Sequence, residues 1–211
     1  FKSPTKVSFV KLINELSKYR IPKINYFKKT KYILGGAQIG GNYSNFKQIK
    51  IERIYKKKLF KENFSYIDTA FNYSKSHQVI SKLNGRDNFN IISKLNYSKI
   101  NCHNKFYMEN FFINFYKILI TINQNRLDTL MIHSFKDFKK NYKNIIEIFK
   151  KLKALKLIDN FGVSIYYPKE LLFLMKNFSN LVIQFPINIV DYRWSTLDLN
   201  LLKSKSKTKL I

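Results

Sequence analysis

Short apolar runs alternate with longer stretches of helical periodicity after about residue 30, and this alternation limits the possible folds more than any other feature. The runs are rich in β-branched residues and apolar almost throughout, as strands of a parallel sheet are when both faces are covered. The candidate strands are Tyr32–Gly35, Ser65–Thr69, Asn90–Lys94, Thr129–His133, Asn160–Ser164 and Leu181–Phe185. Repeated strand–helix units of this kind predict a parallel α/β fold.

The stretches between these runs carry apolar residues at three- and four-residue spacing, which is typical of helices with one buried face. The clearest stripes are Ile51, Ile54, Tyr55 and Leu59; Phe111, Phe115, Leu119 and Ile122; and Ile145, Phe149, Leu152 and Leu155. We expect these stripes to face the core of the fold rather than to bind a cofactor.

Two architectures fit such units, a closed (β/α)8 barrel and an open doubly wound sheet. The open sheet binds a dinucleotide through a G-x-G-x-x-G turn, but residues 35–41 read Gly-Gly-Ala-Gln-Ile-Gly-Gly, which does not fit. A G-x-x-x-x-G-K-[ST] phosphate-binding loop is also absent. A barrel needs eight strands and about 250 residues. Six units in 211 residues therefore predict a TIM barrel that lacks its last quarter.

The formal net charge of +26, from 39 Lys and Arg against 13 Asp and Glu, has two interpretations. One is a polyanionic partner such as nucleic acid. The other is a Lys-, Asn- and Ile-rich composition of the kind that an AT-rich genome imposes. The lysines are scattered along the chain, and no nucleic-acid recognition motif is present. We therefore favour the second interpretation and predict no nucleic-acid partner.

The single cysteine, Cys102, excludes an internal disulfide and a cysteine-based metal site. His77 and His103 lack a paired ligand set, so we predict no bound metal. No apolar run reaches the roughly 18 residues of a membrane span, and we predict a cytoplasmic protein with no membrane partner. Residues 1–30 form a basic N-terminal extension without an assigned function, and residues 31–211 form the barrel domain.

Polar residues interrupt three apolar runs where the predicted strands end, which is where catalytic groups lie in parallel barrels. Asp68 ends the second strand and Tyr73 follows five residues later, Lys94 ends the third strand, and His133 ends the fourth. Each alone has an ordinary explanation, such as a turn cap, a loop aromatic, a lysine reaching solvent or a core histidine. Their occurrence at successive strand ends favours a common site.

These four side chains suit the reduction of a carbonyl. The developing alkoxide needs a proton, and a free Tyr phenol has a pKa of about 10, too high to be well matched near neutrality. Lys94 would lower the pKa of the Tyr73 phenol, and Asp68 would hold Lys94 in place. His133 would donate a hydrogen bond to the carbonyl oxygen. Because none of these residues carries a hydride, the reaction requires a cofactor.

Six segments of the chain resemble the aldo-keto reductase family, in order from about residue 31 to about residue 200. The segment from Ser65 to Ser76 is similar to the family signature Asp-Thr-Ala-x-x-Tyr-Gly-x-Ser. The others are Ile33-Leu-Gly-Gly-Ala-Gln-Ile-Gly, Ile91-Ile-Ser-Lys, Leu127-Asp-Thr-Leu-Met-Ile-His, Leu155-Lys-Leu-Ile-Asp-Asn-Phe-Gly-Val-Ser and Leu181-Val-Ile-Gln-Phe-Pro-Ile-Asn. The family's catalytic Asp, Tyr, Lys and His fall on Asp68, Tyr73, Lys94 and His133.

The resemblance implies NADPH or NADH bound across the barrel mouth, with a small carbonyl compound as substrate. Asp68, Ser164 and Gln184 match family positions that contact the cofactor, the last two at the nicotinamide carboxamide. Three positions depart from the family pattern: Ile165, Ser74 and His77 replace its Asn, Gly and Glu. The family's strands seven and eight, which hold the adenosine phosphates, are expected to be missing. NADPH and NADH therefore both remain open, as does the oligomeric state.

An alternative is a non-catalytic member of the family that binds or regulates without turnover. The missing strands and Ile165 favour this alternative, whereas retention of all four catalytic residue types favours a reductase.

Overall fold

The computed structural model describes residues 32–37, 64–73, 75–84, 89–99, 106–188, 190–195, 197 and 208–211. Seven parallel strands form one sheet in the order β1 to β7, so each strand pairs with the next in the chain. Their bounds are β1 Tyr32–Gly35, β2 Phe64–Asp68, β3 Asn90–Leu95, β4 Leu127–Ile132, β5 Ile158–Ser164, β6 Val182–Gln184 and β7 Lys209–Leu210. This sequential parallel order is that of a (β/α)8 barrel.

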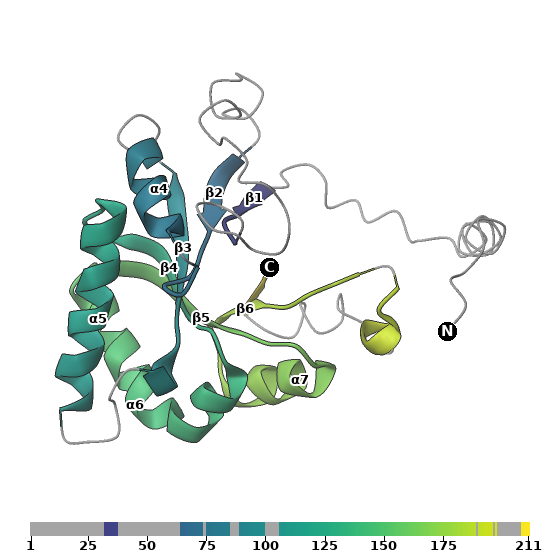
Figure 1. Cartoon of the computed structure of the whole chain (residues 1–211). Coiled ribbons are helices and arrows are strands. Elements are labelled where there is room, and N and C mark those ends of the chain that lie inside the picture. Colours follow the sequence, from purple (N-terminus) through teal and green to yellow (C-terminus); the bar gives the residue numbers. More distant parts are fainter. Residues whose placement is uncertain are drawn as a thin grey trace, which may run out of the picture. The chain divides into compact units, whose positions relative to one another are not determined.

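Among the described residues, four helices follow the strands, and Figure 1 shows them on the outer side of the sheet. They are α4 Ser76–Asn84, α5 Tyr107–Ile122, α6 Phe135–Ala154 and α7 Pro168–Asn177, and short 3-10 turns occur at η2 Tyr97–Lys99 and η3 Tyr192–Trp194. Helix α6 begins at the N-cap Ser134, whose hydroxyl accepts from the Asp137 backbone N–H at 3.2 Å. Helix α5 ends at Asn123, in the left-handed conformation with φ 56° that favours asparagine at this position.

The two faces of the sheet bury different sets of side chains. The larger core lies between the strands and the helices and includes Ile91 of β3 and Phe111 of α5. A smaller cluster on the other face joins Ile92, Met131 and Val182 from β3, β4 and β6. Neighbouring residues in a strand point to opposite faces. Ile91 therefore faces the helix layer, and Ile92 faces the barrel interior.

A contact between β2 and β6 shows that the sheet is curled. The Gln184 side-chain Nε2 lies 3.1 Å from Asp68 Oδ2, although four strand spacings separate β2 from β6 in the sheet order. Strands lie about 4.8 Å apart, so a flat sheet would hold these side chains far from each other. The sheet therefore bends around its interior face, as an incomplete barrel does.

The predicted parallel α/β barrel is confirmed, with boundary differences of a few residues. The first strand matches, whereas β4 and β5 each begin two residues earlier than predicted, at Leu127 and Ile158. The prediction of six strands is wrong, because β7 pairs with β6 in parallel through Val182 and Ile183. At two residues, β7 is too short to show a periodic pattern, and only its pairing with β6 defines it.

The burial of the predicted helical stripes differs from helix to helix. All four residues of the α5 stripe are buried, as predicted. In the α6 stripe Leu155 is 59% exposed, because the helix ends one residue earlier. The stripe from Ile51 to Leu59 lies outside the described residues. The N-terminal extension, residues 1–30, also lies outside them, and its separation from the barrel stays a prediction.

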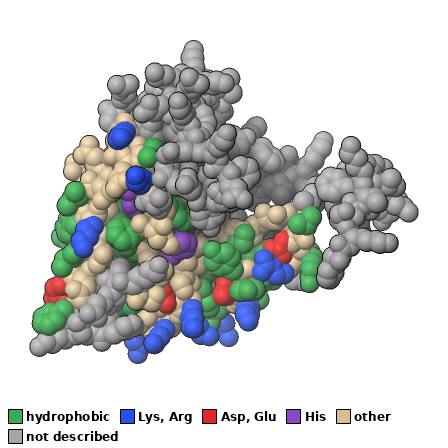
Figure 2. Space-filling model, in the orientation of Figure 1, with side chains coloured by type: hydrophobic (Ala, Val, Ile, Leu, Met, Phe, Trp, Pro, Cys, Tyr) green, Lys and Arg blue, Asp and Glu red, His purple; other side chains and the backbone are tan. Residues whose placement is uncertain are grey.

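The lysines of α6 lie on its outer surface. All seven, at positions 136, 139, 140, 143, 150, 151 and 153, are exposed. Basic side chains follow the lower edge of the face in Figure 2, where α6 and α7 lie. A charged run on the solvated face of an amphipathic helix needs no binding partner to explain it. Within the described ranges, no helix combines the length and apolar character that a membrane crossing requires.

Candidate active site

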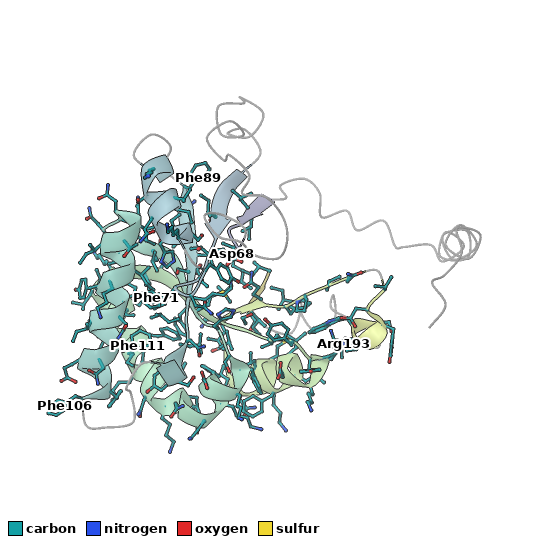
Figure 3. The ribbon with its side chains drawn as sticks, in the orientation of Figure 1. Asp68, Phe71, Phe89, Phe106, Phe111 and Arg193 are labelled. Carbon is teal, nitrogen blue, oxygen red and sulfur yellow. The ribbon has the colours of Figure 1, made fainter. Side chains whose placement is uncertain are left out.

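The structure places the four predicted catalytic residues at the carboxyl edge of the sheet. Asp68 is the last residue of β2, Lys94 is the last but one of β3, and His133 directly follows β4. Tyr73 lies in the loop between β2 and α4. Figure 3 shows Asp68 at the end of β2. The carboxyl ends of parallel strands share one edge of a sheet, and this brings residues 65 positions apart in sequence together.

Asp68 and Lys94 form a buried ion pair through Oδ1 and Nζ, with side chains 15% and 3% exposed. Burial lowers the pKa of the Lys94 ammonium, because a low-polarity environment disfavours its charged form, and the Asp68 carboxylate opposes this change. Removing the carboxylate would leave the ammonium buried without its counter-ion. Asp68 therefore supports the charge on Lys94.

Tyr73 lies between the ammonium and the imidazole. Lys94 Nζ is 5.7 Å from the centre of the Tyr73 ring. The centres of the Tyr73 and His133 rings are 5.9 Å apart, and the two ring planes meet edge to face at an angle of 81°. The structure thus brings a phenol, an ammonium, a carboxylate and an imidazole into one cluster. These are the groups that the sequence predicted would lie together.

Backbone hydrogen bonds hold the loop that carries Tyr73 against the neighbouring strand. The Phe71 backbone N–H donates to the Lys94 carbonyl at 2.9 Å. Within the loop, Tyr73 N–H donates to the Ala70 carbonyl at 3.0 Å, and Ser76 N–H donates to the Tyr73 carbonyl at 2.8 Å. The loop is therefore fixed by the same strand that presents Lys94.

A buried hydroxyl pair ties this loop to the end of β1. Thr69 Oγ1 and Ser76 Oγ lie 2.9 Å apart, and Ser76 Oγ donates to the Gly36 carbonyl at 3.0 Å. Both side chains are fully buried. Gly36 has to be small here, since an added Cβ would lie 2.6 Å from the Asp68 carbonyl oxygen. Sequence reasoning missed this network, although Thr69 and Ser76 belong to the signature segment.

The predicted cofactor residues Ser164 and Gln184 end β5 and β6 and are paired in register. Gln184 Nε2 donates to Asp68 Oδ2 at 3.1 Å. Its Oε1 is buried and has no hydrogen-bond partner among the described residues. Ile165 packs in the hydrophobic core and is fully buried. Its side chain therefore offers no polar contact at the barrel mouth. This agrees with the expectation from the sequence, in which Ile165 replaces the Asn of the family pattern.

From the sequence, His77 was a departure from the family pattern and a histidine without a paired metal-ligand set, and the structure gives it a defined environment. It is 5% exposed, and its Nε2 lies 3.1 Å from Ser93 Oγ on β3. Burial lowers the pKa of His77 to about 4, so the imidazole is neutral at pH 7. Ser93 precedes Lys94, and the His77–Ser93 contact therefore joins α4 to the strand bearing the ammonium.

Within the described ranges, no group of three or more His, Cys, Asp and Glu side chains is arranged to bind a metal ion. Ser74, Cys102 and His103 lie outside the described residues.

Comparisons with known proteins agree with the fold. The sequence pattern of the Aldo/keto reductase family matches residues 31–201. No curated protein sequence matches the chain significantly.

Solved structures give the same result at low identity. An aldo-keto reductase from Pseudomonas aeruginosa is 15% identical with a TM-score of 0.64, over 84% of this chain and 71% of that one. A glycerol dehydrogenase from Gluconobacter oxydans is 16% identical with a TM-score of 0.62, over 85% and 57%. An aldo/keto reductase from Klebsiella pneumoniae, solved with NADP and acetate, is 15% identical with a TM-score of 0.60, over 84% and 62%. The chain spans less than two thirds of the last two proteins.

Proposed function

Because the chain belongs to the aldo/keto reductase family, we propose that it is an oxidoreductase that uses NADPH or NADH to reduce an aldehyde or ketone to an alcohol. The observation that carries this proposal is the buried Asp68–Lys94 pair beside the Tyr73 ring. Such a pair places a positive charge, supported by the Asp68 carboxylate, next to a phenol, which is the arrangement that a tyrosine acid requires.

Each of the four side chains has one role in the proposed reaction. Tyr73 donates the phenolic proton to the carbonyl oxygen as negative charge develops there. The Lys94 ammonium stabilises the phenolate that remains, and Asp68 keeps Lys94 charged and in place. His133, at the edge of the Tyr73 ring, donates a hydrogen bond that orients the carbonyl oxygen. The product alcohol leaves with the Tyr73 proton, and Tyr73 is reprotonated from solvent.

The residues at the mouth fit a nicotinamide. Gln184 Oε1 is a buried acceptor without a hydrogen-bond partner among the described residues, and the carboxamide of a nicotinamide presents an N–H donor of the kind that this oxygen lacks. Ser164, in register with Gln184, would hold the same carboxamide. Asp68 would be a third cofactor contact, as the family pattern implies. The bound nicotinamide would supply the hydride. Two structurally similar reductases from Klebsiella pneumoniae were solved with NADP and NADPH.

A turnover assay tests the proposal. Oxidation of NADPH and NADH is followed with a panel of small aldehydes and ketones, for the unaltered chain and for Tyr73→Phe. We expect the variant to lose activity by about 100-fold or more, because a positioned proton donor contributes about 10²–10⁴-fold. Tyr116→Phe is the matched control, since Tyr116 is 44% exposed on α5, and it should turn over normally.

Two results would count against the proposal in different ways. Equal activity of Tyr73→Phe and the unaltered chain would refute Tyr73 as the acid. Cofactor binding without turnover of any carbonyl would favour the alternative, a non-catalytic relative.

A further inference from the structure

Gln184 makes one contact that cofactor binding does not explain. Its side chain reaches from β6 across the interior of the curled sheet to Asp68 on β2, with 3.1 Å between Nε2 and Oδ2. Residues 68 and 184 are 116 positions apart in the sequence. Among the described contacts, this hydrogen bond joins the two sides of the mouth directly through the carboxylate of the ion pair.

The chemistry of the two groups sets the orientation of the amide. A carboxylate only accepts hydrogen bonds, so the Gln184 NH₂ group has to face Asp68. The amide oxygen then points away from Asp68, and it is this oxygen that is buried and has no hydrogen-bond partner within the described part of the chain. The NH₂ group of Gln184 thus donates to Asp68, while its amide oxygen can still accept a hydrogen bond from a donor.

Asp68 has a distinct partner on each oxygen. Oδ1 accepts from Lys94 Nζ, and Oδ2 accepts from Gln184 Nε2. The Asp68 side chain is 15% exposed, whereas that of Lys94 is 3% exposed. A carboxylate with access to water can rotate towards solvent when a partner is removed. The buried ammonium cannot reach water in this way, so its charge depends on where the carboxylate points.

We propose that Gln184 is a positioning residue for the proton donor: its amide holds the Asp68 carboxylate on Lys94 from the opposite side of the barrel, and so keeps the ammonium charged beside Tyr73. The inference rests on the proposed function in assigning Tyr73 as the acid. It adds that the residue expected to bind the nicotinamide also supports the acid. A donor bound at Oε1 would keep the amide in the orientation that serves Asp68.

The test measures the titration of Lys94 in the cofactor-free chain. The chain is labelled with [ε-¹³C]lysine, and the Lys94 signal is identified by its loss in Lys94→Met. The groups that face Lys94 are the Asp68 carboxylate and the Tyr73 phenol, with the His133 imidazole beside that phenol. Asp68→Asn gives the Lys94 titration when the carboxylate charge is absent.

We expect the pKa of Lys94 to be lower in Gln184→Met by about one pH unit or more, towards its value in Asp68→Asn. Methionine keeps the length of the side chain and removes the donor, so a carboxylate that depended on Gln184 turns away. Gln78→Met on the exposed surface of α4 makes the same exchange and should leave the Lys94 titration unchanged. An unchanged pKa of Lys94 in folded Gln184→Met would overturn the proposal.

A second variant covers the case in which Gln184→Met does not fold. In Gln184→Glu, the introduced carboxyl would hold its proton above its usual range, because it lies beside another carboxylate. Its ionisation would add a second negative charge near Lys94 and produce an extra step in the Lys94 signal between about pH 5 and pH 8. A Lys94 signal without that step would also overturn the proposal. Neither measurement depends on turnover, so loss of the proposed reductase activity would be recognised separately.

Discussion

The burial of His77 makes the stability of the chain depend on pH in a predictable direction. His77 is 5% exposed, and burial lowers its pKa to about 4 from an ordinary value of 6.5. In the unfolded chain the imidazole binds a proton below about pH 6.5, whereas in the folded chain it does so only near pH 4. The unfolded state therefore gains protons first, and the free energy of unfolding falls as the pH drops from about 7 to about 4.

The magnitude follows from the two pKa values. Linkage between 6.5 and about 4 gives a loss of about 2 kcal/mol at pH 5 and about 3 kcal/mol at pH 4, relative to pH 8. Because the side chain is buried, solvent screening reduces this effect little. A loss of this size is a large fraction of the stability of an ordinary domain, about 5–15 kcal/mol.

His77→Gln removes the titrating group and keeps a side chain that can hydrogen-bond Ser93. Urea unfolding at pH 8 and pH 5 measures the free energy of unfolding of both proteins. Other groups titrate in this range, so the informative quantity is the difference between them. We expect His77→Gln to lose about 2 kcal/mol less than the unaltered chain between these pH values.

The reciprocal exchange at the next position is the control. Gln78 is exposed on the same helix, so Gln78→His adds an ordinary histidine and should not change the pH dependence. If His77→Gln and the unaltered chain lost equal stability between pH 8 and pH 5, the neutral, buried His77 would be refuted.

Three further substitutions test the site. Lys94→Met should lower turnover by about 100-fold or more and shift or abolish its pH profile, because the Tyr73 phenol loses the neighbouring ammonium; an unmoved profile would contradict the pairing with Tyr73. Gly36→Ala should cost about 1–3 kcal/mol in thermal unfolding, since the new methyl group would lie 2.6 Å from the Asp68 carbonyl oxygen; a Tm equal to that of the unaltered chain would refute the close approach. Ser76→Ala should cost about 1–3 kcal/mol in urea unfolding through the lost bond to the Gly36 carbonyl and an unpaired Thr69 hydroxyl, whereas Ser81→Ala, on a less buried part of α4, should cost less.

The sequence alone determined the fold class and the cluster of four polar residues. Apolar runs and helical stripes are local patterns, and they identify strands and helices without knowledge of distant contacts. Asp68, Lys94 and His133 were found because parallel strands in a barrel end at the same edge. With this rule, a residue known to end its strand can be placed at the carboxyl edge of the sheet. The roles assigned to these residues remain proposals.

Which side chains meet across the barrel depends on the tertiary structure. The hydrogen bond between Gln184 and Asp68 depends on the curvature of the whole sheet, to which every strand pair contributes. Strand β7 is defined by pairing with β6, and the lowered pKa of His77 comes from burial against β3. None of these features has a local sequence pattern, because each depends on atoms from distant parts of the chain packed at contact distance.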